Sequence, residues 1–164
     1  MKQRIVHNSS GIATLEAIKI WSICGAQYID NANMLEQIDL TLQRSISSFA
    51  LNSRRALERL AKDDKFPLKI SCWSRSGDIS VDKIETDMWN SINIIIHSCE
   101  FETIFESLPN SKSYIESDNK VITFVKISTD KREDVYIDPF SIAYTYISDV
   151  KPFFDEKTKQ SKLK

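Results

Sequence analysis

The chain has 164 residues, of which 41% are hydrophobic, so it is long enough to bury the core of one domain. Its 22 basic and 23 acidic residues leave a net charge of −1, which excludes a global field that would attract nucleic acid or an anionic membrane. Any such binding requires a local patch. No apolar run reaches the roughly 20 residues of a transmembrane helix, and polar Asn8-Ser9-Ser10 follows the N-terminal residues. We therefore expect a cytoplasmic protein with no membrane partner.

The three cysteines, Cys24, Cys72 and Cys99, are widely spaced, and the chain has only two histidines. An odd number without short paired spacings favours a reducing compartment over a disulfide framework or a zinc site. The sequence also lacks a Gly-rich phosphate-binding loop. We therefore expect no metal and no other cofactor.

Two long helices are predicted in the N-terminal half. Residues 10–30 carry too many apolar side chains for a helix with one buried stripe, so we expect this helix to be central in the fold. Apolar residues recur every three or four positions over 34–62, which predicts an amphipathic helix with a charged outer face. Phe66-Pro67 ends it, because the residue before a proline disfavours the helical conformation.

The C-terminal half combines helix and strand. Residues 68–73 fit a short strand, and a third helix is predicted over 82–105. β-Branched and aromatic residues over 120–128 and 134–137 flank a polar turn, which predicts a β-hairpin. Asp138-Pro139 then begins a last helix, since Asp caps helices and Pro fits the first helical position.

Together these elements predict a mainly helical single domain over residues 1–154. We expect an up-down bundle of four to five helices, with a small antiparallel hairpin at about 120–137 before the last helix. Residues 155–164 have the composition of a polar C-terminal tail.

The third predicted helix carries two polar stripes. One is an ordinary solvent stripe, and the other contains Asn90, Asn93, His97 and Glu100 within about one quarter of the helix circumference. Apolar residues border this second stripe on both sides. Because four buried polar groups would all need partners, the stripe is a buried network, a cleft or a subunit interface.

His97 is the one titratable imidazole among hydrophobic residues, and two interpretations of it stay open. In the structural interpretation it bonds Asn93 or a backbone carbonyl of a neighbouring helix. In the functional interpretation His97 is a general acid or base in an open cleft, and Asn93 orients it or a substrate phosphate.

Residues 87–98 (DMWNSINIIIHS), the hairpin that follows and residues 135–140 (VYIDPF) resemble uncharacterised bacterial proteins of the HEPN type. The resemblance implies a helical bundle, a homodimer in which two such helices face across a cleft, and a setting in bacterial toxin–antitoxin or antiviral (phage) defence systems. Many HEPN domains are metal-independent ribonucleases. The catalytic residues implied here are His97 and Asn93, and Asn90 would position the RNA.

The chain departs from the active HEPN enzymes at one position. Those enzymes have an Arg four to six intervening residues before the His, where this chain has Asn90, Ser91 and Ile92. Asn can donate a hydrogen bond to a phosphate but cannot neutralise its charge. An Arg from elsewhere would have to replace it, and the available donors are Arg44, Arg54, Arg55, Arg59 and Arg75. Alternatively, the arginines of the second helix form a solvated face, because acidic residues are interleaved with them.

Two functions follow. The first is an RNA-acting toxin or defence protein, with His97 as the acid–base residue and Arg54, Arg55 and Arg59 as RNA-binding residues. The second is a degenerate, non-catalytic bundle that acts as a protein–protein interaction subunit of a larger system. The missing Arg favours the second, and the retained polar stripe favours the first.

Overall fold

The computed structural model describes residues 2–64, 69–72, 84–114 and 119–162. In chain order the elements are α1 (Lys2–Gly25), β1 (Tyr28–Ile29), α2 (Ala32–Asp64), α3 (Met88–Ile96), β2 (Ser98–Ser107), a 3-10 turn (Asn110–Lys112), β3 (Asn119–Thr129), β4 (Val135–Ile137), α4 (Pro139–Thr145), a π-helical turn (Tyr146–Val150) and α5 (Lys151–Lys162). The fold is mainly helical, as the sequence predicts, but among the described residues the antiparallel sheet has four strands where the sequence predicts a two-stranded hairpin.

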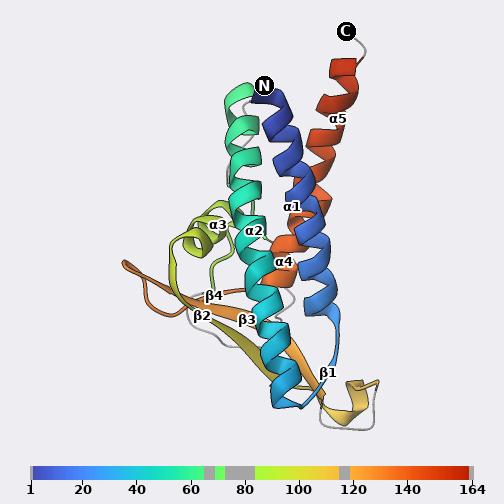
Figure 1. Cartoon of the computed structure of the whole chain (residues 1–164), viewed down its shortest axis with the longest axis vertical. Helices are drawn as coiled ribbons and strands as arrows, with labels where there is room; N and C mark the ends of the chain where they lie inside the picture. The colour runs from blue at the N-terminus through green and yellow to red at the C-terminus, as the bar shows by residue number, and fades with distance from the viewer. Residues whose placement is uncertain (1, 65–68, 73–83, 115–118, 163–164) are drawn as a thin grey trace.

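Helices α1 and α2 lie side by side along the long axis of the molecule, and α4 packs against α1 (Figure 1). The sheet crosses the lower part of this helical layer in the same view. Strand β3 lies at the centre of the sheet, and β2 pairs with it along most of its length. Strand β1 pairs with residues 119–120 of β3, and β4 pairs with residues 125–127. All of these pairings are antiparallel.

The core fills the space between the helices and the sheet. From α2 it takes Leu42, Phe49 and Leu57, and Phe49 meets the buried ring of Tyr146 edge-on with the ring centroids 5.2 Å apart. The Thr103 hydroxyl of β2 donates a hydrogen bond to the Asp39 carboxylate, which ties α2 to the sheet. These contacts fix α2 relative to the strand that follows α3.

Two local predictions are confirmed. The hairpin forms with Val125 opposite Ile137, and its turn places Asp134 at a φ of 52°, a conformation that Asp tolerates better than most residues. Asp138 caps α4, since its carboxylate accepts a hydrogen bond from the Ser141 backbone N–H at 3.1 Å, and Pro139 is the first helical residue. The helix predicted over 34–62 is also confirmed as α2.

The third helix is much shorter than predicted. Helix α3 ends at Ile96, and residues 98–107 form β2 instead of continuing it. Along this strand the exposed Glu100 and Glu102 alternate with the more buried Phe101 and Thr103. Pairing with β3 supplies hydrogen-bond partners for the backbone N–H and C=O groups of β2. Residues 84–87 precede the helix in extended form, with the Glu85 N–H bonded to a carbonyl of β4.

The ends of the chain also differ from the predictions. Helix α1 runs from Lys2 to Gly25 and has an exposed outer face, so it is not the enclosed central helix that its apolar composition suggested. Helix α5 continues to Lys162, so residues 155–162 are helical and not a loose tail. The Lys151 ammonium pairs with the Asp155 carboxylate one turn on, a spacing that supports helix formation.

The strand predicted at 68–73 lies partly outside the described residues. Of its described part, Ser71 forms an isolated antiparallel bridge with Asp87, and the Cys72 N–H bonds the Thr86 carbonyl at 2.7 Å. Among the helices that the structure describes, none is both long and apolar enough to cross a bilayer.

Candidate functional site

Helix α3 is held by a cap at each end. At its start the Asp87 carboxylate accepts a hydrogen bond from the Asn90 N–H at 2.9 Å. At its end the His97 N–H donates to the Asn93 carbonyl at 3.1 Å, so His97 is the residue at which the chain leaves the helix. The inner face of α3 is buried and consists of Met88, Ser91, Ile92, Ile94 and Ile95.

The predicted polar stripe lies on the opposite, open face of α3. Asn90 and His97 are exposed, and Asn93 is half-buried. The buried-network interpretation is therefore wrong for His97, because its side chain is in contact with solvent. Glu100 does not belong to the stripe, since it lies in β2, where it pairs with Ser128. The face is an open surface formed by one short helix.

Trp89 joins this face to α2. Trp89, Asn93 and His97 follow one another at intervals of four residues, the spacing that brings side chains together along a helix surface. The guanidinium carbon of Arg54 on α2 lies 5.8 Å from the centroid of the half-buried Trp89 ring, within the range of a cation–π contact. Its Nε donates to Glu58 Oε1 at 3.0 Å, and this pair is largely exposed.

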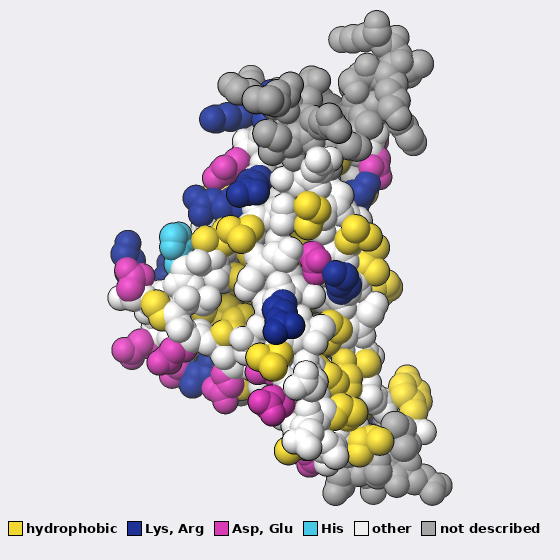
Figure 2. All heavy atoms as spheres, in the orientation of Figure 1, with side chains coloured by type: hydrophobic (Ala, Val, Ile, Leu, Met, Phe, Trp, Pro, Cys, Tyr) yellow, Lys and Arg dark blue, Asp and Glu magenta, His cyan; other side chains and the backbone are white. Residues whose placement is uncertain are grey.

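Of the predicted RNA-binding arginines, Arg54 contacts α3, through Trp89. Arg55 and Arg59 lie about 100° and about 140° round α2 from Arg54, so they face other sides of the helix. Arg55 is exposed and Arg59 is half-buried. Arg75 lies outside the described residues. At the left of Figure 2, Lys and Arg side chains (dark blue) and Asp and Glu side chains (magenta) are interspersed around a His side chain (cyan).

The positions of Arg54 and His97 decide what the face can do. Arg54 stacks near the start of α3, and His97 lies eight residues beyond Trp89, a rise of about 12 Å along the helix axis. A cleavage site needs its acid–base group and its phosphate-binding cation around one phosphate. This arrangement instead presents a cation, an aromatic ring, two amides and an imidazole in a row, which suits contacts to several groups of an extended ligand.

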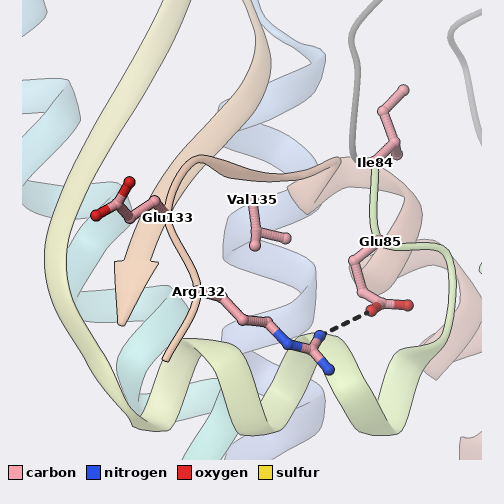
Figure 3. A pocket seen from close by; sticks show the side chains of 5 residues that line it. All are labelled: Ile84, Glu85, Arg132, Glu133 and Val135. Carbon is pink, nitrogen blue, oxygen red and sulfur yellow. Dashed lines mark ion pairs between the residues drawn. The ribbon is translucent and has the colours of Figure 1, made fainter. Parts of the chain in front are cut away.

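A second candidate is the hollow shown in Figure 3, of about 340 Å³, at the tip of the β3–β4 hairpin. Ile84, Glu85, Arg132, Glu133 and Val135 line it. Arg132 Nη1 lies 3.6 Å from Glu85 Oε2, so the two charges at its edge neutralise each other, and Glu133 points away from them. The described lining offers no nucleophile or imidazole, so it carries no chemistry of its own.

The thiol of Cys72 is not activated. Burial, together with the negative charge of Asp87, raises the pKa of Cys72 to about 12, which leaves it protonated at neutral pH. Cys24 is buried, and Cys99 is exposed in β2. Among the described residues, no three His, Cys, Asp or Glu side chains are grouped as a metal site would require.

Sequence reasoning did not identify Trp89 as part of the site. Trp89 is one of the apolar residues that border the polar stripe, and its four-residue spacing from Asn93 is the signal that could have identified it. The contact with Arg54 depends on how α3 packs against α2 and has no local signature.

Comparison with protein-family models, curated proteins and solved structures finds no match to this chain.

Proposed function

We propose that this chain is a cytoplasmic HEPN-like helical bundle that binds RNA in a bacterial toxin or phage-defence system. The observation that carries the proposal is the Arg54–Trp89 contact beside the exposed side of α3, where Asn90, Asn93 and His97 lie. The resemblance of residues 87–98 and 135–140 to HEPN proteins supports the same assignment, as does the mainly helical fold.

The chemistry of this face fits single-stranded RNA. An aromatic ring stacks on any base, and Arg binds phosphate oxygens in a planar, two-pronged geometry. Asn side chains both donate and accept, so they can bind base edges or ribose hydroxyls. Because a net charge of −1 gives the protein no long-range attraction for RNA, binding depends on a local group of side chains such as this one.

In the enzymatic form of the proposal, the chain is a metal-independent ribonuclease with His97 as general acid or base. His97 is accessible, as that role requires. A phosphate bound at Arg54 would lie too far from the imidazole for both groups to act on it, so cleavage requires Arg54 to leave Glu58 and Trp89, or a second cation to approach. We therefore expect binding to be stronger than any catalysis.

The test is incubation of end-labelled transfer RNA and total cellular RNA with the purified protein in chelator. Wild type is compared with His97→Ala and with Ser98→Ala, a neighbouring exposed substitution that serves as the control. Discrete fragments from wild type and Ser98→Ala, but not from His97→Ala, support the ribonuclease. A gel shift without fragments supports RNA binding alone, and the absence of both overturns the RNA proposal.

A second candidate is a non-catalytic interaction subunit of a larger system. It is favoured by the lack of an Arg at the position where active HEPN enzymes have one, and by apolar side chains that α1 exposes. Under this proposal Arg54, Trp89 and His97 contact a protein. Protein capture by the wild type that is lost in Trp89→Ala, with no affinity for RNA in either, would favour it.

A further inference from the structure

The outer face of α1 is apolar and uncovered in the single chain. Leu15 is 62% exposed, Ile18 46% and Ile12 42%, although all three lie in the middle of a long helix. Trp21 is 43% exposed at the border with α4, where its ring lies 6.0 Å from that of Phe140. Figure 2 shows hydrophobic side chains gathered over α1 on this side of the molecule.

The exposed positions of the outer face form a stripe that is symmetric about its own centre, with large apolar residues at its two central positions. Positions spaced by three and four residues along it are all exposed, and they are Asn8, Gly11, Leu15, Ile18, Ser22 and Gly25. The two large apolar residues lie at the centre, with small residues one turn away on each side. An alternating three- and four-residue spacing is the pattern by which two helices pack along a shared seam.

This pattern fits a second copy of the same helix running in the opposite direction. If the two-fold axis passes midway between Leu15 and Ile18, Leu15 packs on the partner's Ile18, and the partner's Leu15 packs on Ile18. The same register places Gly11 opposite the partner's Ser22. A large pair in the centre with small residues on either side lets two helix backbones approach without a clash, and an added Cβ at Gly11 would meet no atom of its own chain within 4 Å.

The polar groups on this face do not oppose burial. The Ser22 hydroxyl already donates to the Ile18 carbonyl at 2.8 Å within its own helix. Glu16 and Lys19 form an ion pair of 2.9 Å between them. The charge of Lys19 beside the seam is therefore compensated within its own chain, and pairing requires no counter-charge from the partner.

We propose that the protein is a homodimer in which the α1 helices of two copies pack antiparallel through Leu15 and Ile18. The seam from Asn8 to Gly25 is about 26 Å long. A stable interface buries about 800 Å² on each partner, and the exposed side chains of Ile12 and Trp21, about 90° round α1 on either side of the seam, widen its apolar surface. The pairing uses α1 and leaves the α3 face of each copy open, unlike a dimer in which two α3 helices meet.

The test is the molar mass of the full chain in reducing buffer, by light scattering after gel filtration at several concentrations. Wild type is expected at twice the 18.9 kDa of one chain. Leu15→Glu and Ile18→Lys should each raise the dimer dissociation constant by at least about tenfold. Tyr114→Glu, at a 91% exposed aromatic residue that is not part of the seam, is the control and should leave the dimer unchanged.

Mixing the two variants tests the register. An equimolar mixture of Leu15→Glu and Ile18→Lys chains should recover dimers, because the introduced acid of one chain faces the introduced base of the other. A monomeric wild type, or a folded Leu15→Glu protein that dimerises as tightly as wild type, would overturn the proposal, as would a mixture that stays monomeric. None of these results depends on RNA, so this proposal and the RNA proposal can fail separately.

Discussion

The guanidinium of Arg54 on α2 lies over the ring of Trp89 on α3, 5.8 Å from its centre. Helix α3 is a single short element of nine residues, so this contact and the buried inner face determine how it sits on α2. The same contact places a cation and an aromatic ring on the side of α3 that carries the exposed Asn90 and His97 and the half-buried Asn93. The relationship between Arg54 and Trp89 is thus both a packing contact and the basis of the proposed RNA surface.

Arg54→Ala should lower the free energy of unfolding by about 0.5–1 kcal/mol, the size of a solvent-exposed cation–π contact. The ion pair with Glu58 adds little, because the Glu58 carboxylate is exposed and solvent screens the pair. Urea denaturation followed by tryptophan fluorescence measures the change. Arg44→Ala, an exposed arginine on the same helix, is the control, and an equal loss in both variants would argue against the contact.

Thr103→Val should lower the free energy of unfolding by about 1–2 kcal/mol. The buried Thr103 hydroxyl donates to the half-buried Asp39 carboxylate, which would lose this donor and, among the described residues, retain Gln43 Nε2 at 2.9 Å. Thr123→Val is the matched control, since the hydroxyl of Thr123 makes a longer bond of 3.4 Å to a backbone carbonyl. Similar losses in the two variants would show that the Thr103–Asp39 bond has no special weight.

Stability should fall in alkaline solution. Burial raises the pKa of Tyr28 and of Tyr146 from 10.0 to about 12, and that of Cys72 from 9.0 to about 12. Between those values the unfolded chain loses protons that the folded chain retains, so the stability present below about pH 9 is lost as the pH rises toward 12. Urea midpoints from pH 8 to pH 12 measure this slope.

Tyr146→Phe provides a specific check on the alkaline slope. The Tyr146 hydroxyl is buried, and the described residues include no hydrogen-bond partner for it, although Ser10 and Thr14 lie close enough to oppose the rise of its pKa. Removing a hydroxyl without a bonded partner should cost little at pH 8. The variant should then lose less stability than wild type above pH 10, and an unchanged slope would contradict the role of Tyr146.

Local signals explain which parts of the fold could be predicted from the sequence. Asp138 and Pro139 are adjacent, and together they signal the start of a helix. The hairpin is marked by β-branched and aromatic residues on both sides of a polar turn. Helix α2 shows an uninterrupted apolar repeat. Residues 98–107 are strand only because β3, some 20 residues further on, pairs with them. That partner cannot be seen from the residues themselves.

The site was predictable to a similar extent. The spacing of Asn90, Asn93 and His97 correctly placed them on one side of a helix, because such periodicity is local. Their exposure depended on where α3 packs, and so did the choice of Arg54 over Arg55 and Arg59. The apolar excess of α1 was visible in the sequence but was assigned to the core. Periodicity shows which residues share a face, and it does not show whether that face meets the protein or its surroundings.

The most direct test of the central claim is the affinity of the protein for a labelled single-stranded RNA, measured by fluorescence anisotropy. Arg54→Ala and Trp89→Ala should each weaken binding by about tenfold or more, since base stacking and phosphate contacts of this kind contribute about 1–3 kcal/mol. Arg44→Ala removes the same charge about 15 Å away along α2 and should have a much smaller effect. Equal effects in all three variants, or no binding by wild type, would contradict the assignment of the α2–α3 face as an RNA-binding surface.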